Sequence, residues 1–445
     1  MPYIPHSTDD REAMLAAVGV SSLDELFTDI PVSARFPELQ VPQAISELET
    51  RWELEDLASS NVSLDEAVGF LGAGAYHHFV PSVVDAVISR SEFYTAYTPY
   101  QPEVSQGTLQ AIFEYQTMIC QLTGMDVSNA SHYDGATATA EAVITAVNLC
   151  RMKRRKIVIS PWLHPEYRAV VRTYTQGMGL QIVGDETETS GDLVGLLDGD
   201  TACLIVQYPD FLGRVDDLTD LAEAVHGAGA LLVVVANPIA LGLLRPPGQF
   251  GADIVVGEGQ PLGAGLNFGG PYLGFFATCQ EHVRKMAGRL VGQTVDADGQ
   301  RGYVLTLSTR EQHIRRDKAT SNICTNQGLV ALAAAVYLAA LGRCGLRRVA
   351  ELCYHRAHYA AEMIDALSDF DVLRDHPFFH EFVVRCPIPI SEINEFLLSE
   401  WNIVGGYDLG RDYPALRDHM LLCVTEMNPR AEIDALVEAL EEAAS

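Results

Sequence analysis

The chain has 445 residues, of which 48% are apolar, and a formal net charge of −29 from 59 acidic and 30 basic side chains. That length suits two or three domains with a substantial core. So acidic a surface disfavours nucleic acid and anionic membranes as partners. The nine cysteines form no CxxC pair or Cys/His cluster at metal spacing. We therefore expect no metal site, reduced thiols and a cytoplasmic protein without a signal peptide.

Residues 1–103 are expected to form short helices joined by proline-bearing extended stretches, as in DIPVSARFPELQVPQ (29–43). Three serine and acid pairs match the capping box, in which each side chain bonds a free amide at a helix start. The pairs are Ser7 with Asp10, Ser22 with Glu25, and Ser63 with Glu66. Such an arm has little core of its own, so we expect it to wrap another part of an assembly.

Residues 104–326 change to the pattern of an α/β domain. An amphipathic helix is predicted over 109–124, ending at Gly124, and a second helix over 136–155. Short apolar strands then alternate with helices. Uniformly apolar strands in this alternation indicate a mostly parallel sheet covered on both faces. The strands are predicted at 156–160, 180–184, 202–209, 231–236, 253–259 and 272–277.

Residues 327–445 are predicted to form a small C-terminal α/β domain. It begins with helices over 328–342 and 351–368. Strand and helix patterns then alternate, and the strands are expected to be antiparallel. The chain thus divides into an arm (1–103), a large α/β domain (104–326), and a C-terminal helix with a small domain.

Two features of the large domain suggest a site at the sheet edge. Gly135 and Thr137 open a helix, where backbone amides and a hydroxyl suit a phosphate, although a capped core helix explains the pattern better. His164 follows a predicted strand, at the end where ligands bind in parallel sheets. A lone histidine there is more often a structural hydrogen-bonding residue.

The loop YTAYTPYQPEVSQG (94–107) combines prolines, which fix an extended backbone, with Tyr97, Tyr100 and Gln101. It is equally compatible with a site or subunit contact and with a packed structural loop.

The segment TREQHIRRDKATSNICTNQ (309–327) is basic in an acidic chain. The charge reversal favours anion binding or subunit pairing over a plain surface segment. The candidate residues are Arg310, His313, Thr320, Ser321 and Asn322.

Three long stretches in order carry a family resemblance: 89–131 (SRSEFYTAYTPYQPE…), GEGQPLG…FGGPYLGFFA (257–277) and the basic segment. Together they resemble the P-protein, or glycine decarboxylase, of the glycine cleavage system. The likeness runs along nearly the whole chain. It matches the separate N-terminal (alpha, subunit 1) form of that protein.

The resemblance implies the fold of type I pyridoxal-phosphate enzymes, similar to aspartate aminotransferase. Such enzymes hold the cofactor as a Schiff base on a lysine and usually place a carboxylate beside its ring nitrogen. Here the position resembling the lysine falls near Gln260 and Pro261, and the chain has no lysine between Lys156 and Lys285. At the carboxylate position it offers only Asn237.

We therefore expect no covalent cofactor on this chain and pyridoxal phosphate on a partner of the C-terminal (subunit 2) type. The resemblance implies further partners in the lipoyl H-protein and the other glycine cleavage components. Two alternatives stay open at this stage. One is an independent pyridoxal-phosphate enzyme that uses Lys318, and the other is a structural homo-oligomer without enzymatic activity.

Overall fold

The computed structural model describes residues 5–186, 192–310, 312–319, 321, 323 and 325–444. Its contacts divide the chain into two units, residues 1–62 and residues 63–445. Each is described by itself.

The first unit consists of helices α1 (Thr8–Val18) and α2 (Glu47–Ala58) joined by extended chain and short 3₁₀ turns. None of its described residues, 5–62, is buried. The capping box predicted at Ser7 and Asp10 is present, and a second box at Ser46 and Glu49 was not predicted. Ser22 makes no side-chain capping bond. This unit has no hydrophobic core of its own.

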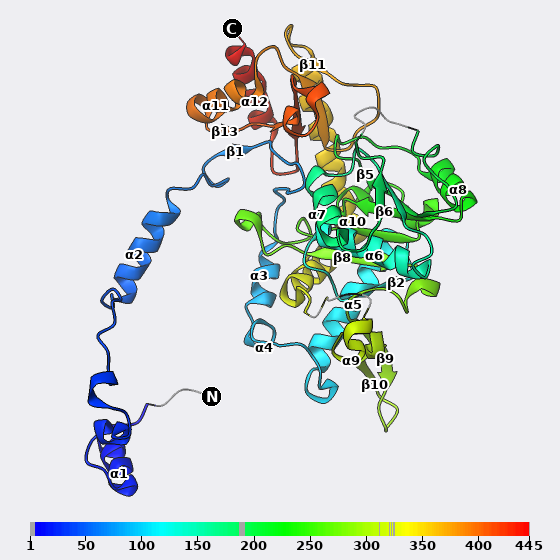
Figure 1. Ribbon diagram of the computed structural model, residues 1–445. Coiled ribbons are helices and arrows are strands. Elements are labelled where there is room, and N and C mark those ends of the chain that lie inside the picture. Colours follow the sequence, from blue (N-terminus) through cyan, green and yellow to red (C-terminus); the bar gives the residue numbers. More distant parts are fainter. Residues whose placement is uncertain are drawn as a thin grey trace. The chain divides into compact units, whose positions relative to one another are not determined.

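The second unit is built on a seven-stranded sheet with the order β2-β8-β7-β6-β5-β3-β4 (Figure 1). Strands β4, β3, β5, β6 and β7 pair in parallel, and β8 and β2 pair antiparallel at one edge. The mostly parallel sheet of the prediction is therefore confirmed. The strands are β2 (Val127–Ser128), β3 (Lys156–Ile159), β4 (Gln181–Val183), β5 (Thr201–Tyr208), β6 (Leu231–Ala236), β7 (Ile254–Glu258) and β8 (Gly274–Thr278).

Side chains of the central strands alternate between two cores, one on each face of the sheet. In β6, Leu232 and Val234 enter one core, which α5, α8 and α10 complete. Val233 and Val235 enter the other core, which α6 and α7 complete. Burial on both faces explains why these strands are apolar without interruption.

The helices around the sheet follow the predicted pattern with two differences. The helix predicted over 136–155 ends at Leu149, because Arg151 and Met152 adopt positive φ angles of 54° and 58°. The two helices predicted after residue 327 are one element, α10, with non-helical angles at Gly342. The helices are α3 (Ser82–Ile88), α4 (Ser91–Tyr94), α5 (Gln106–Thr123), α6 (Gly135–Leu149), α7 (Pro165–Thr175), α8 (Thr219–Gly227), α9 (Gln312–Arg315) and α10 (Gly328–Asp365).

Helix α10 is long and apolar enough to cross a membrane by length and composition alone. Its apolar face instead lies in the protein core, where Ala334, Tyr337 and Ala350 are fully buried. It runs from the core of the large sheet to the core of the small one. We therefore interpret it as a core helix.

A small antiparallel sheet, β11-β12-β15-β14, forms the C-terminal part, as predicted. In Figure 1 it lies with α11 and α12 at one end of this unit, and the unpredicted hairpin β9–β10 lies at the other. The remaining elements are β1 (Val68–Gly69), β9 (Leu290–Val295), β10 (Arg301–Thr306), β11 (Asp371–Val372), β12 (Glu381–Arg385), α11 (Ile390–Trp401), β13 (Ile403–Val404), β14 (Tyr407–Asp408), β15 (His419–Cys423) and α12 (Arg430–Ala443).

Candidate functional site

A small pocket lies where the parallel strands β5, β6 and β7 end, which is the edge at which this class of sheet binds its ligands. Its free volume is about 30 Å³. Ligand pockets usually measure roughly 300–1,000 Å³, so this one has room for little more than water. The lining residues are Gly74, Tyr76, His164, Tyr167, Gln207, Val235, Ala236, Asn237, Pro238 and Glu258.

Gln260 stands where the family resemblance calls for a Schiff-base lysine. Its side chain is fully buried. The Oε1 atom accepts the backbone N–H of Tyr76 at 3.0 Å, and Nε2 donates to the carbonyls of Tyr76 and Ala264, both at 2.9 Å. Pro261, next in the chain, is also buried in a turn. The position thus carries a neutral amide whose oxygen and nitrogen are both hydrogen-bonded to backbone atoms.

Glu258, the last residue of β7, places its buried carboxylate at the N-terminus of α6. Oε2 accepts the N–H of Gly135 at 2.9 Å. Oε1 accepts the N–H groups of Gln260 at 2.8 Å and Leu273 at 2.9 Å. Burial raises the pKa of Glu258 to about 7, although these three amide donors oppose the shift. A helix N-terminus attracts anions, and here the chain supplies the anion itself.

The predicted phosphate-binding residues Gly135 and Thr137 both lie at this helix start. The amide of Thr137 donates to the Asp134 side chain at 2.7 Å in a capping box. The amide of Gly135 is bonded to Glu258. A Cβ on Gly135 would lie 2.4 Å from the Tyr167 hydroxyl oxygen, so glycine is required by close approach. Both predicted amides therefore already have carboxylate acceptors.

His164 caps α7 and lines the pocket. Its Nδ1 accepts the backbone N–H of Glu166 at 3.2 Å, so its Nε2–H donates to the carbonyl of Ala73 at 2.9 Å. This pattern requires the neutral ring, and burial lowers the pKa of His164 accordingly. The ring stacks on Tyr167 with centroids 4.8 Å apart. His164 is thus a structural hydrogen-bonding residue that also lines the pocket.

Asn237 follows β6, where the fold usually offers a carboxylate to a ring nitrogen. Its Oδ1 accepts the N–H groups of Ile239 at 3.0 Å and Ala240 at 3.2 Å. The side chain closes a turn and carries no charge. It cannot stabilise a proton on a ring nitrogen as an aspartate would.

A cover segment, residues 72–76, closes the pocket from the side of the small sheet. The Ala73 amide and the Tyr76 hydroxyl both donate to Glu381 on β12, at 2.8 and 2.9 Å. Gly74 lies so close to His164 that a Cβ would be 2.6 Å from Nε2. The pocket is thus covered by hydrogen-bonded chain from within the subunit.

The tyrosine loop, residues 94–107, lies on the surface of the larger unit. Tyr97 is 77% exposed and Tyr100 51% exposed, and Gln101 is exposed. The buried guanidinium of Arg289 holds the loop by donating to Thr98 at 3.2 Å and to the Tyr100 hydroxyl at 2.8 Å. The loop therefore presents aromatic rings on a fixed backbone.

Between this loop and the start of α10 lies a larger pocket of about 150 Å³. It is mostly apolar and includes Tyr94, Tyr97, Ile112, Asn326 and Leu329 in its lining. It is separate from the pocket at the strand ends, with which it shares no lining residue.

Within the basic segment, the Ser321 hydroxyl donates to Glu141 on α6 at 2.8 Å, which fixes Ser321 against the large domain. Thr320 and Asn322 lie outside the described residues, as do the side chains of Arg310 and His313. The proposed anion-binding role of the segment stays a prediction. Lys318 is exposed and does not line the pocket at the strand ends.

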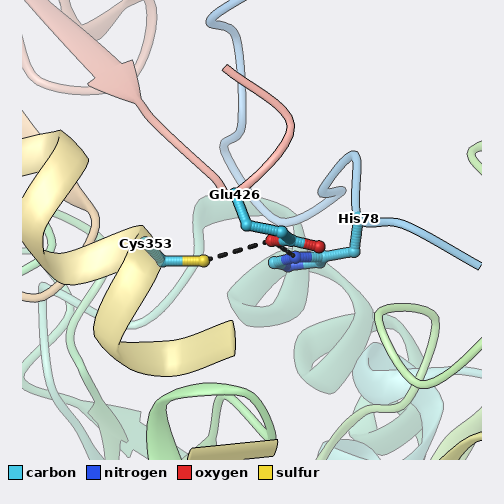
Figure 2. A group of neighbouring side chains, drawn as sticks. All are labelled: His78, Cys353 and Glu426. Atoms are coloured by element: carbon cyan, nitrogen blue, oxygen red, sulfur yellow. Dashed lines mark hydrogen bonds and ion pairs between the residues drawn. The ribbon is translucent and has the colours of Figure 1, made fainter. Parts of the chain in front are cut away.

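The side chains of His78, Cys353 and Glu426 form a cluster (Figure 2). They come from the chain after the cover segment, from helix α10 and from the loop after β15, respectively. The three side chains point toward one another. His78 Nδ1 lies 2.7 Å from Glu426 Oε2, and Cys353 Sγ donates to the same oxygen at 3.3 Å. Their ligand atoms lie within 4.8 Å of one another, a spacing that could hold a metal ion. The three residues are too far apart in the sequence for motif spacing to reveal them.

The fold is that of the type I pyridoxal-phosphate-dependent enzymes. It is shared with the sphingosine-1-phosphate lyase of Burkholderia pseudomallei, at a TM-score of 0.66 and 15% identity over 93% of this chain and 94% of that one. The model of the glycine cleavage system P-protein family matches residues 1–440. The chain belongs to this family.

Its relatives include a probable glycine dehydrogenase (decarboxylating) subunit 1 of Thermomicrobium roseum, 58% identical over 100% of both chains. Another, with the same description, is from Bacillus mycoides and is 54% identical over 98% of each chain. A crystal structure of glycine decarboxylase (P-protein) in inhibitor-bound form superposes with a TM-score of 0.87, at 44% identity over 100% of both chains.

The pocket residues that sequence reasoning missed include Tyr76, Tyr167 and Glu258. Glu258 had a signal, since it is an acidic residue at the end of the apolar run DIVVGEG. A charge there is expected to lie at the ligand-binding edge of a parallel sheet. Tyr76 and Tyr167 had none, because tyrosine is common in cores and in surface loops alike.

Proposed function

We propose that this chain is subunit 1 of a two-subunit glycine dehydrogenase (decarboxylating), and that it holds no covalent cofactor of its own. The partner, of the subunit 2 type, would carry pyridoxal phosphate. There the cofactor would allow glycine to lose carbon dioxide and to pass its aminomethyl group to the lipoyl group of H-protein. Subunit 1 would support that site from outside.

The observation that carries the proposal is the buried Gln260 at the lysine position. An amide nitrogen is not a nucleophile toward an aldehyde, so this residue cannot form a Schiff base. Its side chain is also fixed by three hydrogen bonds to backbone atoms. With no lysine between residues 156 and 285, the surrounding sequence supplies no substitute.

The other residues of the pocket also do not fit pyridoxal phosphate. The free volume of about 30 Å³ is far below that of the cofactor. Glu258 places a carboxylate where the phosphate would sit, and Asn237 lacks the charge that the ring nitrogen needs. Three separate requirements fail together with the lysine.

The surface of the chain supports a role as an assembly partner. The tyrosine loop presents Tyr97 and Tyr100, which are aromatic residues of the kind enriched at interfaces. The first unit exposes apolar side chains along its whole described length, including Phe36, Trp52 and Leu57. We propose that both contact subunit 2, and that the assembly works in the cytoplasm with H-protein and the other glycine cleavage components.

Two other functions receive less support. An independent enzyme using Lys318 would need that lysine beside the pocket, but it is exposed in a short turn after α9. A structural homo-oligomer would not account for relatives named as a dehydrogenase subunit.

The test is to purify this chain alone, its subunit 2 alone, and the two together, each with pyridoxal phosphate. Absorbance of the aldimine, and a pyridoxyl-lysine peptide after borohydride reduction, should appear only where subunit 2 is present. Glycine–bicarbonate exchange should require both chains. A trapped pyridoxyl-lysine in this chain alone, or exchange by this chain alone, would contradict the proposal.

A further inference from the structure

We propose that Tyr167 and Glu258 together fill, from within the chain, the seat in which this fold holds an aromatic phosphate ester. On this view the chain keeps the shape of that ligand site, here called the seat, but fills it with its own side chains. Removing those side chains would create a binding site for a ring that bears a phosphate. The inference rests on the proposed function, because it explains how the chain stays free of cofactor.

Three landmarks define the seat. The N-terminus of α6 at Gly135 is the place for a phosphate, because backbone amides and the helix dipole favour an anion there. Asn237 marks the place of a ring nitrogen, and Gln260 that of the aldehyde carbon. Glu258 and Tyr167 line one pocket with Asn237. Glu258 also accepts the amides of Gly135 and Gln260, so the two occupying side chains lie among the landmarks.

Glu258 reproduces the anionic end of such a ligand. Its two carboxylate oxygens accept three backbone N–H groups, from Gly135, Gln260 and Leu273, at 2.8–2.9 Å. A carboxylate bound to amides at a helix start uses the donors that a phosphate would use. Above its raised pKa of about 7, where it is ionised, Glu258 also repels a second anion, since two negative charges in one buried site raise each other's energy.

Tyr167 reproduces the aromatic end. Its ring stacks on His164 with centroids 4.8 Å apart and planes 23° from parallel. Its hydroxyl reaches the α6 start, because a Cβ on Gly135 would lie 2.4 Å from it. The nearby Glu258 also contributes to raising the pKa of Tyr167, after burial. The side chain therefore spans from the stacking histidine to the anion end of the pocket.

The experiment removes both occupants and offers a ligand of matched shape. The Tyr167→Ala/Glu258→Ala variant and the wild-type chain are titrated with pyridoxine 5′-phosphate by calorimetry. This probe has the ring and the phosphate but no aldehyde, so surface lysines cannot trap it. Pyridoxine without phosphate tests whether the anion end matters. The matched control is Tyr174→Ala/Glu223→Ala, in which both residues are exposed.

We expect the double variant to bind pyridoxine 5′-phosphate at least about ten-fold more tightly than pyridoxine, and the wild type and control to show no saturable binding. Failure of the folded double variant to bind the probe would overturn the proposal. So would saturable binding by the wild-type chain, because an occupied seat has no room.

A single variant keeps the proposal testable if the double variant does not fold. Glu258→Ala leaves three amide donors without their acceptor, which inorganic phosphate can restore. Phosphate should therefore raise the Tm of Glu258→Ala by at least about 3 °C more than sodium chloride of equal ionic strength does. The wild type should show no such difference. Equal shifts in the two proteins would contradict the self-occupied seat.

These outcomes are separable from those of the proposed function. Trapping of pyridoxyl-lysine in the wild-type chain would sink the proposed function itself. A wild-type chain that traps nothing, together with an emptied seat that binds nothing, would sink only this inference.

Discussion

At the scale of single residues, the buried contact between His78 and Glu426 shifts the pKa of a carboxyl that stabilises the fold. Burial by itself would raise the pKa of Glu426. The hydrogen bond and charge of His78, together with the N–H of Phe79, lower that pKa to about 2. A carboxyl whose pKa is lowered on folding stabilises the folded state fully at pH values above its ordinary pKa of 4.5. This contribution is lost as the pH falls toward 2.

We predict that Glu426→Gln lowers the free energy of unfolding by about 3 kcal/mol at pH 7, because it leaves buried His78 without its charged partner. The difference from wild type should shrink between pH 4.5 and 2, because the Glu426 carboxyl of the unfolded chain becomes protonated first and that of the folded chain stays ionised until about pH 2. Urea unfolding across this range measures it. Glu438→Gln on exposed α12 surface is the control and should change little. A difference independent of pH would contradict the ion pair.

At the scale of elements, helix α2 buries none of its side chains among the described residues of its unit. Leu48 and Trp52 stand one turn apart and are 55% and 58% exposed. Apolar side chains at this spacing form a stripe that a partner can cover. The capping box at Ser46 satisfies free amides at the start of α2 without any contribution from a partner.

We predict that Leu48→Ser/Trp52→Ser weakens binding to subunit 2 at least about ten-fold, because exposed apolar side chains gain their stabilisation only on association. The Tm of the isolated chain should stay unchanged. The control Glu53→Ser/Asp56→Ser alters the same helix at exposed polar positions. Equal affinities of the two variants, measured by calorimetry, would exclude α2 from the interface.

The tyrosine loop leads to a second prediction at this scale. Tyr97→Ala should leave the Tm of the chain unchanged, because the ring is 77% exposed. If the loop lines the shared site, glycine–bicarbonate exchange by the assembled enzyme should fall by about ten-fold or more. Tyr174→Ala on exposed α7 surface is the control. Full exchange activity in Tyr97→Ala would return the loop to a structural role.

At the scale of the whole molecule, three buried carboxyls work against stability at high pH. Burial raises the pKa values of Glu141, Glu258 and Glu381 to about 7 each. Between pH 4.5 and about 7, each of these carboxyls keeps its proton in the folded state and has lost it in the unfolded state. Its contribution is fully present below pH 4.5 and is lost as the pH rises through 7. The net charge of −29 adds self-repulsion.

We therefore predict that these three carboxyls make the free energy of unfolding fall between pH 5 and pH 8, against the opposite contribution of buried His132 and His380, whose pKa values burial lowers to about 3. Glu141→Gln should reduce the fall in the free energy of unfolding by on the order of 3 kcal/mol at most, because it removes a carboxyl whose pKa is raised from 4.5 to about 7. Glu223→Gln, at an exposed position, should leave the slope unchanged. Urea unfolding at fixed ionic strength is the measurement. The same pH dependence in Glu141→Gln and in wild type would contradict the raised pKa of Glu141.

Much of the fold could be predicted from the sequence, because its signals are local. The apolar runs of β5, β6 and β7 and the glycine stop of α5 have direct physical causes in burial and in positive φ. The absence of a lysine near Gln260 can be read directly from the sequence, without a structure. The hairpin β9–β10 was missed, because its strands are partly polar and lie at the surface of the unit.

The site could be predicted only in outline. The resemblance located Gln260 and Asn237, and the helix start at Gly135 followed from its glycine and threonines. The sequence could not show that Glu258, 123 positions away, accepts the Gly135 amide. Nor could it show that the cover segment bonds Gln260 and Glu381, because such contacts depend on the packing of distant segments. The same holds for the cluster of His78, Cys353 and Glu426.

The cover segment and the residues after it have a mechanical consequence. The carbonyl and amide of Tyr76 are bonded to Gln260 of the large domain, while its hydroxyl is bonded to Glu381 of the small sheet. At the next residue, the carbonyl of His77 accepts the Thr425 hydroxyl at 2.7 Å. Residues 76–77 thus link the large domain to the small sheet, which are the two parts that a hinge motion would separate. We therefore expect this chain to stay closed while a partner acts, and to offer that partner a fixed wall.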